Sequence, residues 1–142
     1  MEMQDEPHRK PPVEFTLKTD KGNYDIEACV TLIGVDVLVA IRGGEKPHIG
    51  AVAVAQPRPS LRDPDVTSST ASVFCFCGHK EDDLAKAAAL KISAVLNANV
   101  VVTAGIHWDN LGPEGIRAVV SNTEILVGMI ISKLSSASPS AQ

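Results

Sequence analysis

Histidine recurs beside glycine at three places in the sequence, together with other side chains that bind or react. Residues 47–50 read Pro-His-Ile-Gly, residues 78–81 read Gly-His-Lys-Glu, and residues 105–109 read Gly-Ile-His-Trp-Asp. Imidazole can act as an acid, a base or a metal ligand, and sites are often assembled from loops at strand ends. Any one histidine alone is as well explained by a solvated or capping role. Their shared pattern favours a common site containing His48, His79 and His107.

The second of these motifs has the features of an anion site. A β-rich run at residues 73–77 changes within a few residues into a helical pattern, which predicts a helix over 80–97. His79 and Lys80 then lie at the start of that helix, where free N–H groups and the helix dipole favour a phosphate. Lys80 is otherwise an ordinary surface lysine, and no phosphate-binding loop signature is present. We predict a phosphate site at His79 and Lys80, with Arg42 as a second available cation.

The third motif contains a side chain that could stack against a flat ligand. Trp108 is the only tryptophan and stands between His107 and Asp109. An indole suits stacking against an aromatic ring, although Trp108 could equally serve as a cover over the sheet edge. We predict that His107, Trp108 and Asp109 contact an aromatic ligand, and adjacency alone assigns no role to the carboxylate.

A metal site is the less favoured interpretation of the cysteines. Cys75, Cys77 and His79 alternate along a strand pattern, so their side chains would share one face. Zinc sites more often use a Cys-x-x-Cys pair with two further ligands, and small thiols are common in protein cores. We therefore expect neither a metal ligand nor a catalytic residue among these positions.

Composition sets the broad class. The chain has 142 residues, 44% of them hydrophobic, with a net charge of −4 and a mean hydropathy of +0.09. No basic surface for nucleic acid is expected from this charge. No apolar run approaches the ~20 residues of a membrane span, and the polar N-terminus is unlike a signal peptide, so we expect no membrane and a cytoplasmic location. We predict one domain at 13–135 between disordered tails at 1–12 and 136–142.

The pattern of hydrophobic residues predicts strands, two helices and one long loop. Strands are expected at 13–18, 24–33, 35–41, 51–55, 73–77 and 100–104, and helices at 80–97 and about 113–135. The second helix can also be read as two pieces, because residues 121–124 have the form of a capping box. Prolines predict a mobile or ligand-covering loop at 56–69. The predicted fold is α/β of the α+β type, with a largely antiparallel sheet of about six strands and both long helices on one face.

The order and spacing of residues 48–50, 78–81 and 105–109 resemble those of a known family, the small D subunits of gallate-type decarboxylases. Members of that family are described as prenylated-flavin chaperones, and the resemblance covers roughly residues 13–135. It implies a domain similar to proteasome-assembly chaperones, handling of prenylated flavin mononucleotide (prenylated FMN), and a noncatalytic partnership with the large subunit of a prenylated-flavin-dependent decarboxylase. The candidate binding residues remain those chosen on chemical grounds: His48, His79, Lys80, His107, Trp108 and Asp109.

The leading hypothesis is a carrier or chaperone that binds prenylated FMN and forms a homo-oligomer. Its activity would be binding rather than turnover, with the phosphate at His79 and Lys80 and the flavin ring near Trp108. The first alternative is a small enzyme that uses the histidines as acid and base groups or as metal ligands. The second is a structural assembly subunit in which the motifs only shape turns.

Overall fold

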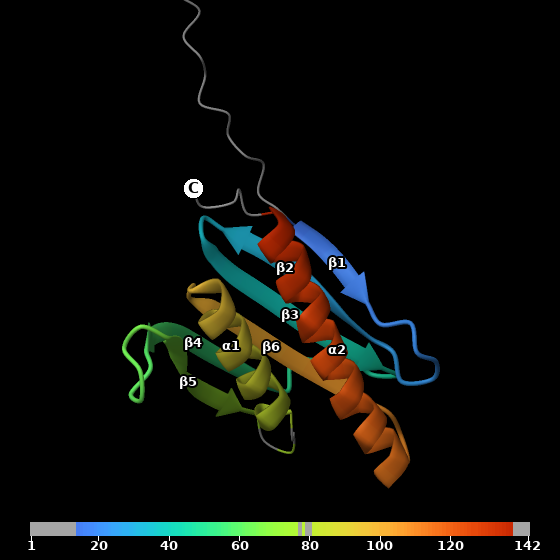
Figure 1. Ribbon diagram of the computed structural model, residues 1–142. Helices are drawn as coiled ribbons and strands as arrows, with labels where there is room; N and C mark the ends of the chain where they lie inside the picture. Colours follow the sequence, from blue (N-terminus) through green and yellow to red (C-terminus); the bar gives the residue numbers. More distant parts are fainter. Residues whose placement is uncertain (1–13, 77, 79–80, 138–142) are drawn as a thin grey trace, which may run out of the picture.

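The computed structural model describes residues 14–76, 78 and 81–137. Six strands form one sheet in the order β1-β2-β3-β6-β4-β5, and two helices lie across one of its faces (Figure 1). The strands are β1 (Glu14–Lys18), β2 (Ile26–Ile33), β3 (Asp36–Gly44), β4 (Ala51–Pro59), β5 (Thr67–Cys75) and β6 (Val100–His107), and the helices are α1 (Asp82–Leu96) and α2 (Pro113–Ala137). The predicted fold class is confirmed.

The predicted tails fall largely outside the described residues. This holds for residues 1–12 and 138–142, whereas residues 136 and 137 continue α2 instead of starting a tail. Two predicted site residues, His79 and Lys80, also lie outside the described part of the chain, as does Cys77.

One pair of neighbouring strands is parallel, and it gathers several chain ends at one edge of the fold. β3 and β6 run in the same direction and finish together, with Gly44 opposite His107, while every other neighbouring pair is antiparallel. β4 begins at this edge, because Ala51 lies opposite Ala104. We call this region, formed by residues 42–50, 81 and 104–109, the motif end.

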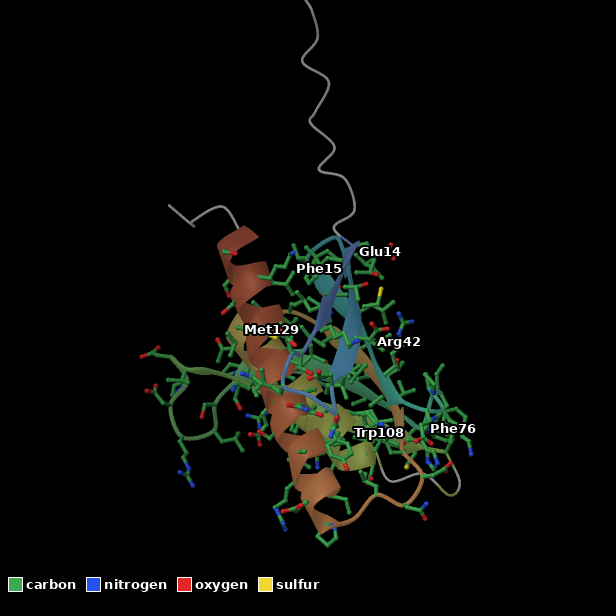
Figure 2. All side chains as sticks on the ribbon, turned by 90° about the vertical axis from the view of Figure 1, so that its right-hand side faces the viewer. Glu14, Phe15, Arg42, Phe76, Trp108 and Met129 are labelled. Carbon is green, nitrogen blue, oxygen red and sulfur yellow. The ribbon has the colours of Figure 1, made fainter. Side chains whose placement is uncertain are left out.

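The core lies between the sheet and the helices. Alternate side chains of β2, β3, β4 and β6 are buried on the helix side, as expected for a sheet with one covered face. α1 packs over β4, β5 and β6, and α2 packs over β1 and β2. In Figure 2, Phe15 and Met129 lie on the helix side, whereas Arg42 and Phe76 lie on the other side of the sheet. No helix covers that second face within the described residues.

The proline-rich segment is not the long loop that the sequence predicts. β4 continues through Pro57 and Pro59, and β5 already begins at Thr67, so only a short turn separates them. The pairing of β4 with β6 stops at Ala55, and beyond it β4 pairs with β5 alone. One side of β4 is therefore a sheet edge at both prolines, which is where proline is tolerated in a strand.

The second helix is one piece, so the alternative with a break at residues 121–124 is wrong. The two residues in the middle of this segment bond to groups outside it. Nδ2 of Asn122 donates to the carbonyl of Tyr24 at 2.7 Å, and Oγ1 of Thr123 donates to the carbonyl of Val119 at 2.8 Å. Because these bonds leave the helical backbone intact, α2 runs through the segment.

By length and composition α2 could cross a membrane, since an 18-residue window of Pro113–Ser136 reaches a hydropathy of 1.3. The expectation that no segment has this character was therefore wrong. Its apolar face, however, packs within the fold: Leu126 and Ile130 are fully buried, and Val127 and Leu134 nearly so. A core helix passes the same test of length and hydropathy.

Candidate functional site

The segment 45–50 lies directly against the end of β6. The backbone N–H of Glu45 donates to the carbonyl of His107 at 2.8 Å, and that of Gly50 donates to the carbonyl of Ala104 at 2.9 Å. These bonds bring the first and third histidine motifs together at the motif end.

Two glycines make this close approach feasible. A Cβ atom at Gly105 would overlap the carbonyl oxygen of His48. One at Gly44, whose φ is +87°, would overlap the carbonyl oxygen of His107. Both clashes are with backbone, which cannot move aside as a side chain can, so the contact between the motifs depends on glycine at these positions.

Glu81 joins the start of α1 to the same place. Its Oε1 lies 3.0 Å from Nε2 of His48, and the two side chains are only 11% and 22% exposed. The same oxygen accepts a hydrogen bond from the backbone N–H of Ile106 at 3.3 Å. Because a carboxylate removed from water needs such partners, Glu81 holds the segment 45–50, the end of β6 and the start of α1 in one arrangement.

Replacing Glu81 with alanine should therefore lower the free energy of unfolding by about 2–3 kcal/mol, the cost of breaking a largely buried hydrogen-bonded pair. Urea denaturation measures the change. Asp83→Ala is the matched control, because Asp83 is an exposed carboxylate in the first turn of the same helix. Equal stability of the two variants would show that Glu81 does not hold the motif end together.

His107 and Asp109 form a second pair nearby. Nε2 of His107 lies 2.9 Å from Oδ1 of Asp109, and Nζ of Lys46 lies 3.6 Å from the same oxygen. The hydrogen bond from His107, followed by the charge of Lys46, holds the pKa of Asp109 below its ordinary value. Because its pKa is lowered, the ionised Asp109 stabilises the fold at pH values above the ordinary pKa of aspartate. This stabilisation is lost as the pH falls through the lowered pKa. At neutral pH Asp109 is thus an ionised acceptor that orients His107.

Trp108 forms one wall of an open cavity of about 490 Å³ on the β1–β2–β3 side of the motif end. The ring of Tyr24 meets the indole edge-on, with centroids 5.4 Å apart and an interplanar angle of 79°. Gly43 and Gly44 also line the cavity. The volume of the cavity is within the range of small-molecule sites, and the indole, which Tyr24 contacts, provides a flat aromatic face.

The charges around this cavity suit a ring better than a phosphate. Two cations, Lys18 and Arg42, and three carboxylates, Asp25, Glu27 and Glu45, line it. Arg42 is already paired with Glu27. The pKa of Asp25 is lowered, chiefly by the backbone N–H of Lys21, so this carboxylate is also ionised at neutral pH. An anion placed here would meet more negative than positive charge.

A second hollow of about 470 Å³ lies between the two helices, away from the histidine motifs. Its walls are mainly apolar and include Leu84, Ala87, Val120 and Val127. This groove between α1 and α2 is the chief alternative place for an apolar ligand.

The structure brings four of the six predicted site residues to the motif end: His48, His107, Trp108 and Asp109. Sequence reasoning missed Glu81 as the partner of His48. It noted Arg42 as a cation but did not foresee its pairing with Glu27. Among residues 14–76, 78 and 81–137, no group of three histidine, cysteine, aspartate or glutamate side chains is arranged to hold a metal ion.

Comparison with known proteins gives concordant results. Residues 20–135 match a family model described as the prenylated flavin chaperone LpdD-like domain. The chain is 29% identical over 119 residues to Protein LpdD of Lactiplantibacillus plantarum, covering 84% of each chain. Among solved structures it resembles a chain of a novel chaperone complex for yeast 20S proteasome assembly, with a TM-score of 0.54 and 15% identity, covering 87% of this chain and 95% of that one. At that identity the last likeness concerns the fold alone.

Proposed function

Since the chain belongs to the family of LpdD-like prenylated flavin chaperones, we propose that it binds prenylated FMN at the motif end and supplies it to a partner decarboxylase. The observation that carries the proposal is the cavity of about 490 Å³ walled by Trp108. It is large enough for a substantial part of a flavin, and its aromatic wall suits the ring system.

The ligand is oriented by the distribution of charge. The isoalloxazine ring lies against Trp108, where the surplus of carboxylates disfavours a phosphate. His48, His107 and Asp109 belong to the motif end but do not line the cavity, so they would contact the ring only where it extends beyond the cavity. The phosphate lies toward His79 and Lys80, next in sequence to Glu81, whose contacts with His48 and Ile106 tie it to the motif end. Binding and delivery, with no bond made or broken, are the activity.

Replacing Trp108 with alanine should weaken prenylated FMN binding by roughly 5- to 150-fold, the equivalent of about 1–3 kcal/mol of lost stacking. Anaerobic calorimetric titration gives the dissociation constants. Trp108→Phe keeps an aromatic face and should retain most of the affinity. Inorganic phosphate should bind Trp108→Ala and the unchanged protein equally, because the indole does not contact the phosphate end.

The groove between the helices provides the decisive comparison. Ala87→Trp would fill that groove with a bulky side chain, and Ala87 is exposed on α1, so the fold should tolerate it. We expect unchanged flavin affinity. Loss of binding in Ala87→Trp with normal binding in Trp108→Ala would move the flavin site to the groove.

Two other functions predict different results. A structural assembly subunit would bind no flavin in any of these titrations, yet would still associate with the decarboxylase. A small enzyme would turn over a substrate with the purified chain alone, in a reaction sensitive to loss of His107. The carrier instead binds the flavin and shows activity only through its partner.

A further inference from the structure

Trp108 lies just past the end of β6, so contacts with its neighbours decide the direction of its indole. The ring of Tyr24 meets the indole edge-on, with centroids 5.4 Å apart. At Gly44 an added Cβ atom would lie 3.1 Å from Cδ2 of the indole, so the indole also packs against the end of β3. Gly44 is fixed by the sheet, whereas Tyr24 lies in the β1–β2 loop (residues 19–25), between the strands. The orientation of the indole therefore depends on how that loop is held.

The β1–β2 loop is ordered within itself by Asp25. The carboxylate of Asp25 accepts hydrogen bonds from Oγ1 of Thr19 at 2.8 Å and from the backbone N–H of Gly22 at 3.1 Å. Gly22 and Asp25 also line the cavity of about 490 Å³ described above. Because these bonds close the loop on itself, it moves as a unit and carries a wall of the cavity with it.

Helix α2 holds the β1–β2 loop, which lies beside it, at two points (Figure 1). Nδ2 of Asn122 donates to the backbone carbonyl of Tyr24 at 2.7 Å, and Asn122 is only 6% exposed. A Cβ atom at Gly115 would lie 3.2 Å from Cζ of Tyr24, so the tyrosine ring packs closely over the start of α2. Gly115 and Asn122 are two helical turns apart and share one face of the helix. Tyr24 is thus fixed on α2 through both its carbonyl and its ring.

We propose that Asn122 is a positioning residue for the cavity. It fixes the β1–β2 loop on α2 and, through the ring of Tyr24, the orientation of the indole of Trp108. Asn122 does not itself line the cavity, so it acts only through the loop. Without the amide donor the carbonyl of Tyr24 loses its buried partner, and the loop must shift to regain one from water. The effect on flavin binding rests on the proposed function, whereas the effect on the indole does not.

Intrinsic fluorescence tests the proposal, because Trp108 is the only tryptophan in the chain and its emission is read alone. Asn122→Leu removes the donor but keeps a side chain of similar size. In this variant without ligand, we expect emission at longer wavelength and faster quenching by acrylamide, because the indole loses a fixed neighbour and meets more water. Prenylated FMN should bind roughly 2- to 13-fold more weakly, the orientation-dependent part of an aromatic contact, since the indole itself remains.

Thr123→Val is the matched control for Asn122→Leu. Thr123 is the next residue of α2, is 4% exposed, and donates a bond of similar length, 2.8 Å, to the carbonyl of Val119. It does not line the cavity beside Trp108. Its loss should destabilise α2 to a similar degree without changing the emission, the quenching or the flavin affinity. Asn122→Ala removes the donor with a smaller side chain and covers the case in which Asn122→Leu fails to fold.

Three results would overturn the proposal. One is unchanged emission and quenching in folded Asn122→Leu or Asn122→Ala. Another is an equal change in Thr123→Val, which would show a general loosening of α2. The third is unaltered flavin affinity in a variant whose indole has moved. If the unchanged protein takes up no prenylated FMN, the proposed function fails, and the fluorescence of the ligand-free variants still decides whether Asn122 positions the indole.

Discussion

Replacing Gly105 with alanine should lower the free energy of unfolding by about 3 kcal/mol, at the upper end of the usual cost of overpacking. The added Cβ would overlap the backbone carbonyl of His48. Relief requires the segment 45–50 to move away from β6, which also breaks the contact between His48 and Glu81. Urea denaturation gives the change in stability from the shift of the midpoint at constant slope.

Gly128→Ala is the control for the change of glycine to alanine itself. Gly128 lies within α2, and a Cβ there meets no atom within 4 Å. Alanine favours helix over glycine by up to about 1 kcal/mol, so this variant should be slightly more stable than the unchanged protein. If Gly105→Ala were as stable as Gly128→Ala, the packing of the two histidine motifs against each other would be contradicted.

Replacing Lys80 with alanine should raise the dissociation constant of prenylated FMN by roughly 10- to 150-fold. This is the loss of a charge-assisted hydrogen bond to the phosphate, worth about 1.5–3 kcal/mol. The effect should fall as salt is added, because the attraction is between charges. Calorimetric titration at two salt concentrations measures both.

Arg42→Ala and Lys91→Ala are the controls for Lys80→Ala. Arg42 lines the cavity beside Trp108 but is paired with Glu27, so its removal should change affinity by less than about 3-fold. Lys91 is exposed farther along α1 and should have no effect. A large loss in Arg42→Ala with none in Lys80→Ala would place the phosphate in the cavity instead and reverse the proposed orientation of the ligand.

The fold follows from the sequence where local pattern and tertiary context agree. The β-rich runs at 24–33 and 35–41 predicted β2 and β3, and the stripe on residues 80–97 predicted α1 to within two residues at its start and one at its end. Prediction failed where context overrides a local signal. Pro57 and Pro59 are accepted because β6 no longer pairs with β4 there. Residues 121–124 start no new helix because α2 runs unbroken through them, and Asn122 in this segment bonds to Tyr24 of a distant loop. In both cases the segment that decides the outcome, β6 or Tyr24, is far away in the sequence.

The candidate site was predictable in its parts but not in its connections. The glycine and histidine motifs marked the segments that approach closely. The structure shows why glycine is needed at Gly105 and at Gly44, since a Cβ atom at either position would overlap a backbone carbonyl. The parallel pairing of β3 with β6 brings the ends of these strands together, and no local motif encodes that pairing. The same holds for Glu81, which looks like an ordinary first-turn carboxylate in sequence but is buried and contacts His48 and the backbone N–H of Ile106.

The visible absorption spectrum of the protein purified under anaerobic conditions from cells that make prenylated flavin tests the account most directly. The account predicts a flavin spectrum at roughly one flavin per chain, and its loss or strong reduction in Trp108→Ala and Lys80→Ala prepared in the same way. A colourless protein that also takes up no prenylated FMN on titration would contradict the proposed carrier function.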